Sequence, residues 1–503
     1  MVRLLRWPLV LLLTIFFVAA ARAAEDDVKG FIDAPFDESP FDDSMVEDED
    51  PPPPLEQEVP LAPNAAHDES LRSSPVAPPG HSLGHSPNQA NWIQPPGCGG
   101  SQSCCNGCCN GCCNSCCNGC CNGCCCQDCG DAGPMRLLPQ SGFFELYGWL
   151  DGGYMGNTTN GPGAVFHGPY NAVDRSEGMF NQAYLVAERS VAKSECFDVG
   201  GRLDALYGFD FFLAQSLGVE LNQDGSNRWN QSQYYGLAMP QAYLEAGNQQ
   251  ASIKVGHFYS IVGFEGVTAP SNFFYSKAYS YQFAGPFTHW GALATYKAND
   301  NWQLQGGAHL GWNALDRQQD HVSFIGGLKY TNDCRDFWSS FAVTTGEEPN
   351  NPAGLGGIQN QYANRTRYSF IVDKQYCSWE YVFHHWMGIQ QAGAPGGGTA
   401  LWYGIDQYLY YRWNACHRFG VRAEWFRDEQ GTRVGLNRPG NPNNPPLPGS
   451  YYSLSAGWNW TPNANLVVRP EIRWDIQDGP NRPYDNGRKD YQVMLGLDTI
   501  VLF

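Results

Sequence analysis

Charged residues are scarce in this 503-residue chain, at 16 %, against roughly 25 % in ordinary soluble domains. After residue 24 the chain also lacks any apolar run long enough for a transmembrane helix, so a later membrane crossing would require strands. It has no phosphate-binding Gly-Lys-Ser/Thr loop and no His-Glu-x-x-His zinc motif. The sequence therefore argues against an enzyme, and no catalytic residue, metal site or cofactor is predicted.

Glycine and aromatic residues are abundant instead. The 57 glycines and the aromatic content of 14 % favour a β protein with many turns. The net charge of −19 is unevenly spread, because 16 acidic residues between Glu25 and Gly97 face only Lys29 and Arg72. The acidity is thus a property of an N-terminal tail, and nucleic acid is not predicted as a partner.

Three segments precede the main domain. Residues 1–24 combine Arg3 and Arg6 with an apolar run and the small-x-small site Ala21-Arg22-Ala23, which predicts a secretory signal peptide. Residues 25–97 are acidic and Pro-rich, and we expect them to be disordered. Residues 98–134 form a Cys-Cys-Asn-Gly repeat that holds 15 of the 19 cysteines.

The Cys-rich repeat has three interpretations. In an exported protein thiols are normally oxidised, which favours disulfides within the segment or between copies of the chain. Adjacent thiolates could instead bind a soft metal ion. A third interpretation is an expanded repeat without a specific role, and spacing alone does not reveal any pairing.

The remaining residues, 143–503, alternate between apolar and polar side chains. From Trp302 to Trp312 one face carries apolar residues with an aromatic at each end, whereas the other carries Gln303, Gln305 and His309. A period of two predicts a strand with one apolar face, and terminal aromatics fit a membrane-spanning strand between two aromatic girdles.

The same pattern recurs about sixteen times. The predicted strands are 143–155, 179–190, 197–212, 238–247, 251–258, 288–297, 302–312, 322–331, 336–345, 365–373, 378–388, 400–412, 416–427, 450–460, 465–475 and 490–503. An even number is typical of closed bacterial barrels, and about sixteen strands leave an aqueous channel. Fourteen or eighteen strands are also compatible with the soft boundaries.

Long and short gaps alternate between these segments, as expected for long extracellular loops and short periplasmic turns. The last strand ends on Phe503, a terminal aromatic of the kind that the outer-membrane assembly machinery recognises. The fold class predicted is all-β: a transmembrane, antiparallel, up-and-down β-barrel after a disordered acidic and Cys-rich N-terminal region.

Several motifs resemble those of a known family, the OmpL-like β-barrel porins of diderm bacteria. The matching stretches are 201–204 (GRLD), 240–245 (PQAYLE), 254–258 (KVGHF), 272–276 (NFFYS) and 286–291 (PFTHWG). The resemblance implies a barrel in the bacterial outer membrane, in contact with its lipid, and a porin activity. It does not account for the Cys-rich segment.

Charged residues on the polar faces are candidates for lining a pore. The basic candidates are Arg202, Lys254, Lys329, Arg367, Arg418, Arg422, Arg469 and Arg473; the acidic candidates are Asp204, Glu245, Glu380, Asp406, Glu424, Glu471 and Asp475. The two signs nearly balance, so neither cation nor anion selectivity follows. Each residue could equally belong to a structural ion pair in the interior.

The gap from Tyr259 to Phe287 is unusually aromatic for a solvated loop, and Glu265 and Lys277 are its only charges. We interpret it as a constriction loop inside the barrel, with an outer cap as the alternative. Cys196, Cys334, Cys377 and Cys416 all lie at short gaps, hence on the periplasmic side. They are candidates for disulfides, either along that rim or to the N-terminal segment, which would also be periplasmic.

The function predicted is an outer-membrane porin for passive diffusion of small hydrophilic solutes or ions. The alternative is a structural anchor with a closed lumen, cross-linked to envelope partners through its Cys-rich segment. A homo-oligomer is compatible with either interpretation.

Overall fold

The computed structural model describes residues 144–503 except 163, 165, 170–174, 193, 223–224, 231–233, 317–320, 350–361 and 435–446. The predicted signal peptide, the acidic segment and the Cys-rich repeat lie outside the described residues. Among the described residues no helix has the length and apolar character needed to span a bilayer.

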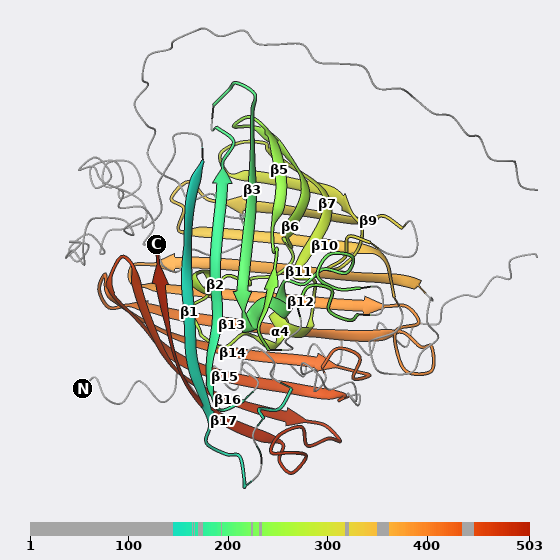
Figure 1. The fold of residues 1–503 in the computed structure, drawn as a ribbon, viewed down its shortest axis with the longest axis vertical. Helices are drawn as coiled ribbons and strands as arrows, with labels where there is room; N and C mark the ends of the chain where they lie inside the picture. Colours follow the sequence, from blue (N-terminus) through green and yellow to red (C-terminus); the bar gives the residue numbers. More distant parts are fainter. Residues whose placement is uncertain are drawn as a thin grey trace, which may run out of the picture. The chain divides into compact units, whose positions relative to one another are not determined.

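The described chain forms an antiparallel sheet that closes on itself (Figure 1). Its strands are β1 (Glu145–Asn157), β2 (Gly178–Arg189), β3 (Asp198–Gly208), β4 (Gly236–Ala238), β5 (Ala242–Gly247), β6 (Ala251–Tyr259), β7 (Thr288–Lys297), β8 (Trp302–His309), β9 (Ser323–Thr331), β10 (Phe337–Pro349), β11 (Tyr362–Tyr376), β12 (Trp379–Gln390), β13 (Ala400–Arg412), β14 (His417–Asp428), β15 (Gly449–Asn463), β16 (Leu466–Asp478) and β17 (Tyr491–Leu502).

Pairing of β1 with β17 closes the ring, in a register that places Trp149 opposite Leu502. Strands β4 and β5 both pair with β3, at consecutive positions, and are two halves of one barrel strand. The break falls at Pro240, which has no N–H to donate to a ladder. The described part is therefore a closed barrel of 16 strands, which confirms the predicted fold class.

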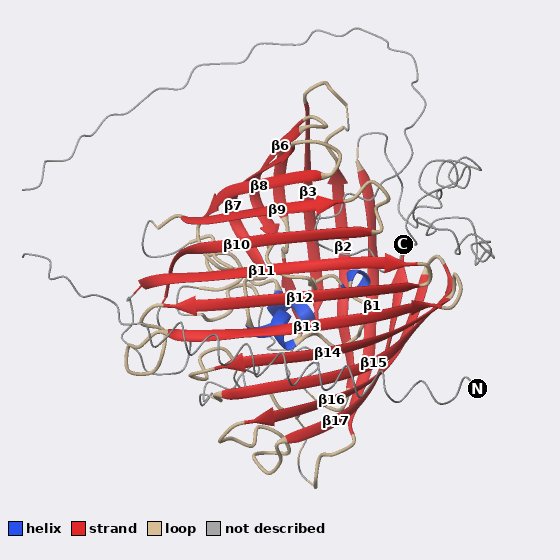
Figure 2. Cartoon of the chain, turned by 180° about the vertical axis from the view of Figure 1, so that it is seen from behind, coloured by secondary structure: helices blue, strands red, loops and turns tan. Residues whose placement is uncertain are grey.

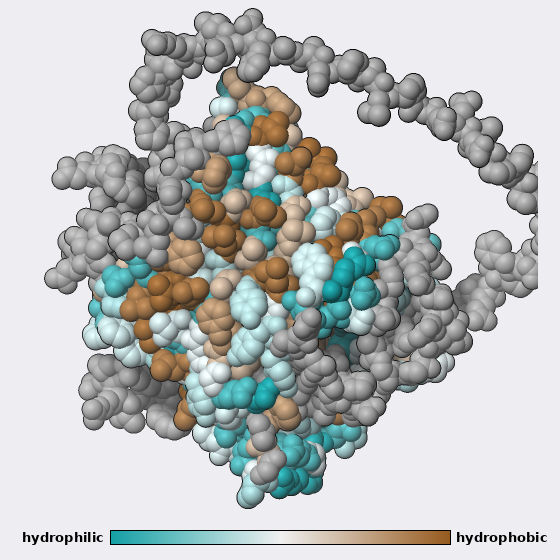
Figure 3. All heavy atoms as spheres, in the orientation of Figure 1, coloured by the Kyte–Doolittle hydropathy of each residue, from teal (hydrophilic) through white to brown (hydrophobic). Residues whose placement is uncertain are grey.

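The outer face of the wall is apolar. Exposed side chains alternate with buried ones along the strands, as in β16, where Ile472 and Trp474 are exposed and Arg473 is buried. Figure 3 shows apolar residues gathered over one face of the wall. Alternation of this kind arises because successive strand side chains point to opposite faces, and the apolar face suits lipid.

One predicted strand end is wrong. The run from 302 to 312 was expected to keep Trp312 on the outer apolar face, but β8 ends at His309. The chain turns at Gly311, whose φ of 120° is accessible mainly to glycine, and Trp312 is buried in the interior. Its backbone N–H donates to Glu348 on β10, 2.9 Å away.

Two connections carry short helices. The 3-10 helix η1 (Phe209–Leu213) follows β3 directly, so the strand predicted for 197–212 is shorter than expected. The 3-10 helix η2 (Ala269–Ser271) and the helix α4 (Tyr279–Phe283) both belong to the connection between β6 and β7. Figure 2 shows these helical turns within the outline of the strands.

Candidate functional site: a loop folded into the barrel

The connection of residues 260–287, called the inward loop below, crosses the barrel interior. Its ends are neighbours, because Tyr259 on β6 pairs with Thr288 on β7. Its middle, however, reaches strands far from β6 and β7 in the ring order. The N–H of Ser276 donates to Glu471 on β16 at 2.8 Å, and the indole of Trp402 on β13 donates to the carbonyl of Ala284 at 2.9 Å.

Apolar side chains of the inward loop pack against the wall on several sides. Four separate buried clusters join the loop to the wall. Ile261 and Val262 pack against β7, β9 and β10, and Phe264, Phe273 and Phe274 pack against β11–β13. Tyr279 and Phe283 pack against β12–β15, and Val267 and Ala269 pack against β1, β2, β16 and β17. Aromatic residues that looked unusual for a solvated loop therefore form the core of this barrel. The loop lies in the interior and does not cap the outer mouth.

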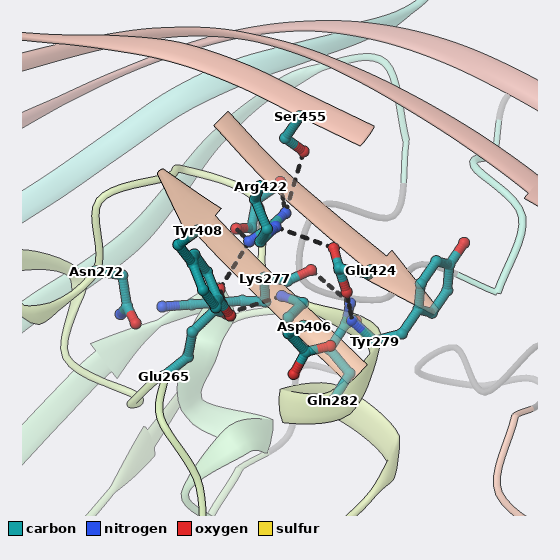
Figure 4. A network of polar contacts seen from close by, with 12 residues as sticks. Glu265, Asn272, Lys277, Tyr279, Gln282, Asp406, Tyr408, Arg422, Glu424 and Ser455 are labelled. Carbon is teal, nitrogen blue, oxygen red and sulfur yellow. Dashed lines mark hydrogen bonds and ion pairs between the residues drawn. The ribbon is translucent and has the colours of Figure 1, made fainter. Parts of the chain in front are cut away.

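Arg422 on β14 is the centre of a buried ionic network beneath the loop (Figure 4). Its guanidinium lies 2.8 Å from Glu265 of the loop, 2.9 Å from Glu424 on its own strand and 3.9 Å from Glu471 on β16. It also donates to the carbonyl and the hydroxyl of Ser276, at 2.9 Å and 2.7 Å. Because all these groups are buried, each charge depends on the others for compensation.

Carboxylates of the network also hold the backbone of the loop. Glu424 accepts the N–H of Tyr279 at 2.6 Å, which fixes the first turn of α4. Glu265 accepts the N–H of Ala278 at 2.8 Å. Buried backbone groups need such partners, so the strands and the loop stabilise each other's polar atoms.

Two further arginines bind the loop from β16. Arg473 forms an ion pair with Asp475 at 2.7 Å and donates to the carbonyl of Lys277 at 2.9 Å. Arg469 pairs with Asp498 and donates to the carbonyls of Ala269 and Asn272, at 3.0 Å and 2.7 Å. The wall arginines thus serve the loop carbonyls as well as the carboxylates.

Glu265 and Lys277, the predicted charges of the constriction loop, are both buried. The ammonium of Lys277 donates to the carbonyl of Gly266 at 3.1 Å and lies 5.5 Å from the ring centre of Tyr281. Figure 4 shows both side chains beside Arg422 and Tyr408.

A second ionic cluster lies on β2 and β3. Arg202 pairs with Asp204 at 2.7 Å and with Glu188 at 3.1 Å. Asp204 also accepts hydrogen bonds from the hydroxyl of Tyr184 and the amide of Gln241. The predicted interior charges Arg202 and Asp204 are therefore brought together.

Three other basic candidates, Lys254, Lys329 and Arg418, stack on interior aromatics. Lys254 lies 4.5 Å from the ring centre of Tyr243, and Lys329 lies 4.4 Å from that of Trp338. Arg418 pairs with Glu380 at 2.6 Å and lies 4.8 Å from the ring centre of Tyr410. Such contacts stabilise a cation in a partly desolvated wall.

The four isolated cysteines lie at the short connections between strands: Cys196 between β2 and β3, Cys334 between β9 and β10, Cys377 between β11 and β12, and Cys416 between β13 and β14. Cys196 is exposed. They share one end of the barrel. Cys196 has a free thiol, whereas Cys377 and Cys416 are each disulfide-bonded, and the identity of their partners stays a prediction.

Sequence reasoning missed one chain of hydrogen bonds. Ser369, His384 and Asp406 lie on the adjacent strands β11, β12 and β13. The Ser369 hydroxyl is 3.0 Å from Nε2 of His384, and Nδ1 of His384 is 2.8 Å from Asp406. The arrangement has the connectivity of a serine nucleophile with its base, but Ser369 is buried and is not among the described residues that line the neighbouring cavity.

Comparisons with known proteins address the family. Residues 144–503 match the family model described as "Putative beta-barrel porin-2, OmpL-like". A comparison with curated proteins gives no match.

Among solved structures, the chain is similar to the outer membrane channel DcaP of Acinetobacter baumannii, at 12 % identity over 72 % of this chain and 97 % of that chain, with a TM-score of 0.46. It is also similar to in-vitro folded OmpT, an outer membrane protein of Vibrio cholerae, at 10 % identity over 73 % and 100 %, with a TM-score of 0.48. An anion-selective porin from Comamonas acidovorans gives 8 % identity over 72 % and 99 %, with a TM-score of 0.45. At identities of 8–12 % and TM-scores below 0.5, these similarities carry no argument about the solute or the oligomeric state of this chain.

Proposed function

Because the chain belongs to the OmpL-like β-barrel porin family, we propose that it is a pore through which small hydrophilic solutes or ions diffuse passively across the bacterial outer membrane. One observation carries the proposal: a closed barrel of 16 strands with an apolar outer face encloses an interior lined by charged side chains. A barrel of this size is wide enough to hold a channel, and charged linings act on passing ions.

The inward loop would set the narrowest part of this pore. Glu265 and Lys277 on the loop face Arg422, Glu424, Glu471 and Arg473 on the wall, and Arg469 lies nearby. Arg202, Asp204, Lys254, Lys329 and Arg418 would line other parts of the interior. Both signs of charge are present in close contact, so local fields and not a net charge would act on the solute.

Several partners belong to the same proposal. Outer-membrane lipid would cover the apolar face, and the barrel-assembly machinery would recognise the closing strand through Phe503. The N-terminal segment would lie in the periplasm, since β1 begins at the end that carries the short turns. A homo-oligomer and disulfide-linked envelope partners, through Cys196, Cys334, Cys377, Cys416 or the Cys-rich repeat, would complete the assembly.

The test is single-channel conductance of the purified full chain in a planar bilayer, beside a variant that lacks residues 25–130. Discrete, reproducible open steps in both would support the pore and make the N-terminal segment an accessory. A folded, heat-modifiable barrel that stays electrically silent in both would overturn it.

A second candidate function is a structural anchor with a closed lumen. The observation in its favour is the packing of the inward loop against strands on several sides of the barrel. An anchor would be silent in the bilayer and would change its association with the envelope when reductant cleaves disulfides. A pore would conduct with or without reductant.

A further inference from the structure

A small cavity of about 30 Å³ lies between the inward loop and the wall strands β11 and β12. Arg367 on β11 and His384 on β12 line it from the wall, and Ser260, Glu265, Ser280 and Tyr281 line it from the loop. A water molecule needs roughly 10–15 Å³ of such space, so the cavity admits a few waters or a small ion and no larger molecule. Polar groups dominate this lining, which suits a polar ligand.

The guanidinium of Arg367 has no ion-pair partner among the described residues. Its side chain is buried, with 2 % exposed, and among the described residues no carboxylate lies within 4 Å of its guanidinium. One amino group donates to the carbonyl of Val262, whereas Nε has no hydrogen-bond partner. A buried cation is normally paired, because the unpaired state forfeits its hydration.

Two acids lie near this guanidinium, but neither forms an ion pair with it. Asp406 on β13 is buried and acts on Arg367 from beyond ion-pair distance. Glu265 lines the cavity but is bound elsewhere. Glu265 is held by Arg422 at 2.8 Å and by the N–H of Ala278 at 2.8 Å. The hydroxyl of Tyr281, which also lines the cavity, is buried and without a hydrogen-bond partner. Two unused donors, one of them cationic, therefore border one cavity.

The loop backbone is shaped around the guanidinium. A Cβ added to Gly285 would lie 2.3 Å from an amino nitrogen of Arg367 and 2.6 Å from its Cζ. Glycine at this position lets the loop approach Arg367 directly, so a side chain here would displace the guanidinium.

We propose that this cavity binds a small oxyanion, a carboxylate or phosphate group, through the guanidinium of Arg367 and the hydroxyl of Tyr281. Guanidinium groups favour oxyanions because their N–H donors match the spacing of the oxygen pair. The site deepens the proposed pore by naming anionic solutes as one class that it would retain, but binding in the cavity does not itself require conduction.

The experiment is calorimetric titration of the detergent-solubilised full chain with sodium phosphate, and separately with sodium acetate, at constant ionic strength. Saturable binding of either anion is expected for the natural sequence. Arg367→Gln should weaken it at least tenfold, since a hydrogen bond to a charged group contributes about 1.5–3 kcal/mol. Tyr281→Phe should weaken it about threefold to tenfold.

The matched control is Arg427→Gln, which removes the same charge from a residue that pairs with Glu429 at 2.7 Å and does not line the cavity. It should bind like the natural sequence. Heat-modifiable migration on gels verifies the barrel in every variant, and Tyr281→Phe still tests the site if Arg367→Gln fails to fold. Absence of saturable binding to both anions, or equal binding by Arg367→Gln, would overturn the proposal. Saturable anion binding by a protein that does not conduct would contradict the proposed pore but would support the anion site.

Discussion

Arg422 binds three largely buried carboxylates, which belong to two strands and one loop. Such a network is costly to assemble, because each ion loses its hydration, and it is held by the completeness of its pairing. Its geometry joins Glu265 and Arg422, which are 157 positions apart in the chain. The residue therefore links the inward loop to the wall as well as balancing charge.

Arg422→Gln should destabilise the protein by about 3–5 kcal/mol, because it leaves Glu265, Glu424 and Glu471 buried without their common cation. The free energy of unfolding can be measured by urea titration in detergent micelles. Hydrogen exchange should also show faster exchange across residues 260–287. The control Arg427→Gln breaks a partly exposed pair and should change the free energy by at most about 1 kcal/mol. Equal stability of Arg422→Gln and the natural sequence would show that the network adds nothing.

The sequence predicts which face of a strand a charged side chain lies on, but not which residues it pairs with. Arg202, Arg422 and Arg473 were expected on the polar face from a period of two, and all three lie in the interior. The partners depend on which residues meet across strands, as where the register places His384 opposite Asp406. They also depend on the path of the inward loop, which no local pattern encodes. The cavity at Arg367 was missed for the same reason.

The barrel strand formed by β4 and β5 is interrupted at Pro240, and side chains outside the strand supply hydrogen bonds there. Glu220, in the connection after η1, accepts the N–H of Met239 at 2.8 Å and the N–H of Ser216 at 2.9 Å. The carbonyl of Met239 accepts from His257 on β6 at 2.8 Å. These contacts replace ladder hydrogen bonds beside Pro240, so the connection completes the wall there.

Glu220→Ala should destabilise the wall locally, next to Pro240. It would leave two backbone N–H groups without their acceptor, a local cost of about 1–3 kcal/mol for each buried group that stays unsatisfied. Hydrogen exchange at Met239 and Ser216 should accelerate, while exchange in β13–β16 stays unchanged. Glu177→Ala, at a half-exposed carboxylate in a different connection, should leave both amides protected. Unchanged protection in Glu220→Ala would mean that the wall closes without the carboxylate.

Asp485 joins two connections at the end of the barrel that carries the long loops. It accepts the N–H of Gly161 at 2.8 Å and lies 3.6 Å from the ammonium of Lys489. The hydrogen bond from Gly161, followed by the charges of Arg488 and Lys489, holds the pKa of Asp485 below its ordinary value. A lowered pKa in the folded state means that the contact stabilises at neutral pH and is lost as the pH falls through that lowered value.

Protection of the Gly161 amide should therefore persist from pH 7 down to the ordinary range of aspartate and then decline at lower pH. Hydrogen-exchange protection factors, corrected for the intrinsic pH dependence, measure this directly. Asp485→Asn should show weak protection at every pH and no transition. A transition that survives in Asp485→Asn would assign the effect to another group.

For the whole molecule, the barrel could be predicted because its two signatures are local. Alternation marks each strand, and the order of long and short gaps marks the up-and-down topology, as in the hairpin of β13 and β14, where the predicted and observed bounds nearly coincide. Exceptions occur where tertiary contacts override the pattern. Trp312 continues the alternation of β8 but turns inward to pack beneath the guanidinium groups of Arg365 and Arg433. The packing of the inward loop inside the barrel likewise depends on tertiary contacts, so no local pattern in the sequence predicts it in detail.

The inward loop can be removed without disturbing the ladders, because Tyr259 and Thr288 are already paired at its base. Replacing residues 261–286 by a short Gly-Ser turn should leave a heat-modifiable barrel, since the wall pairs through its own backbone. Water would then reach the interior and solvate the charges of Arg422 and its partners, so the loss of their burial need not unfold the wall. We expect the single-channel conductance to rise several-fold if the loop narrows a pore, and to appear for the first time if the loop closes the lumen. A folded variant whose conductance equals that of the full chain would show that solutes pass, or are stopped, elsewhere in the barrel.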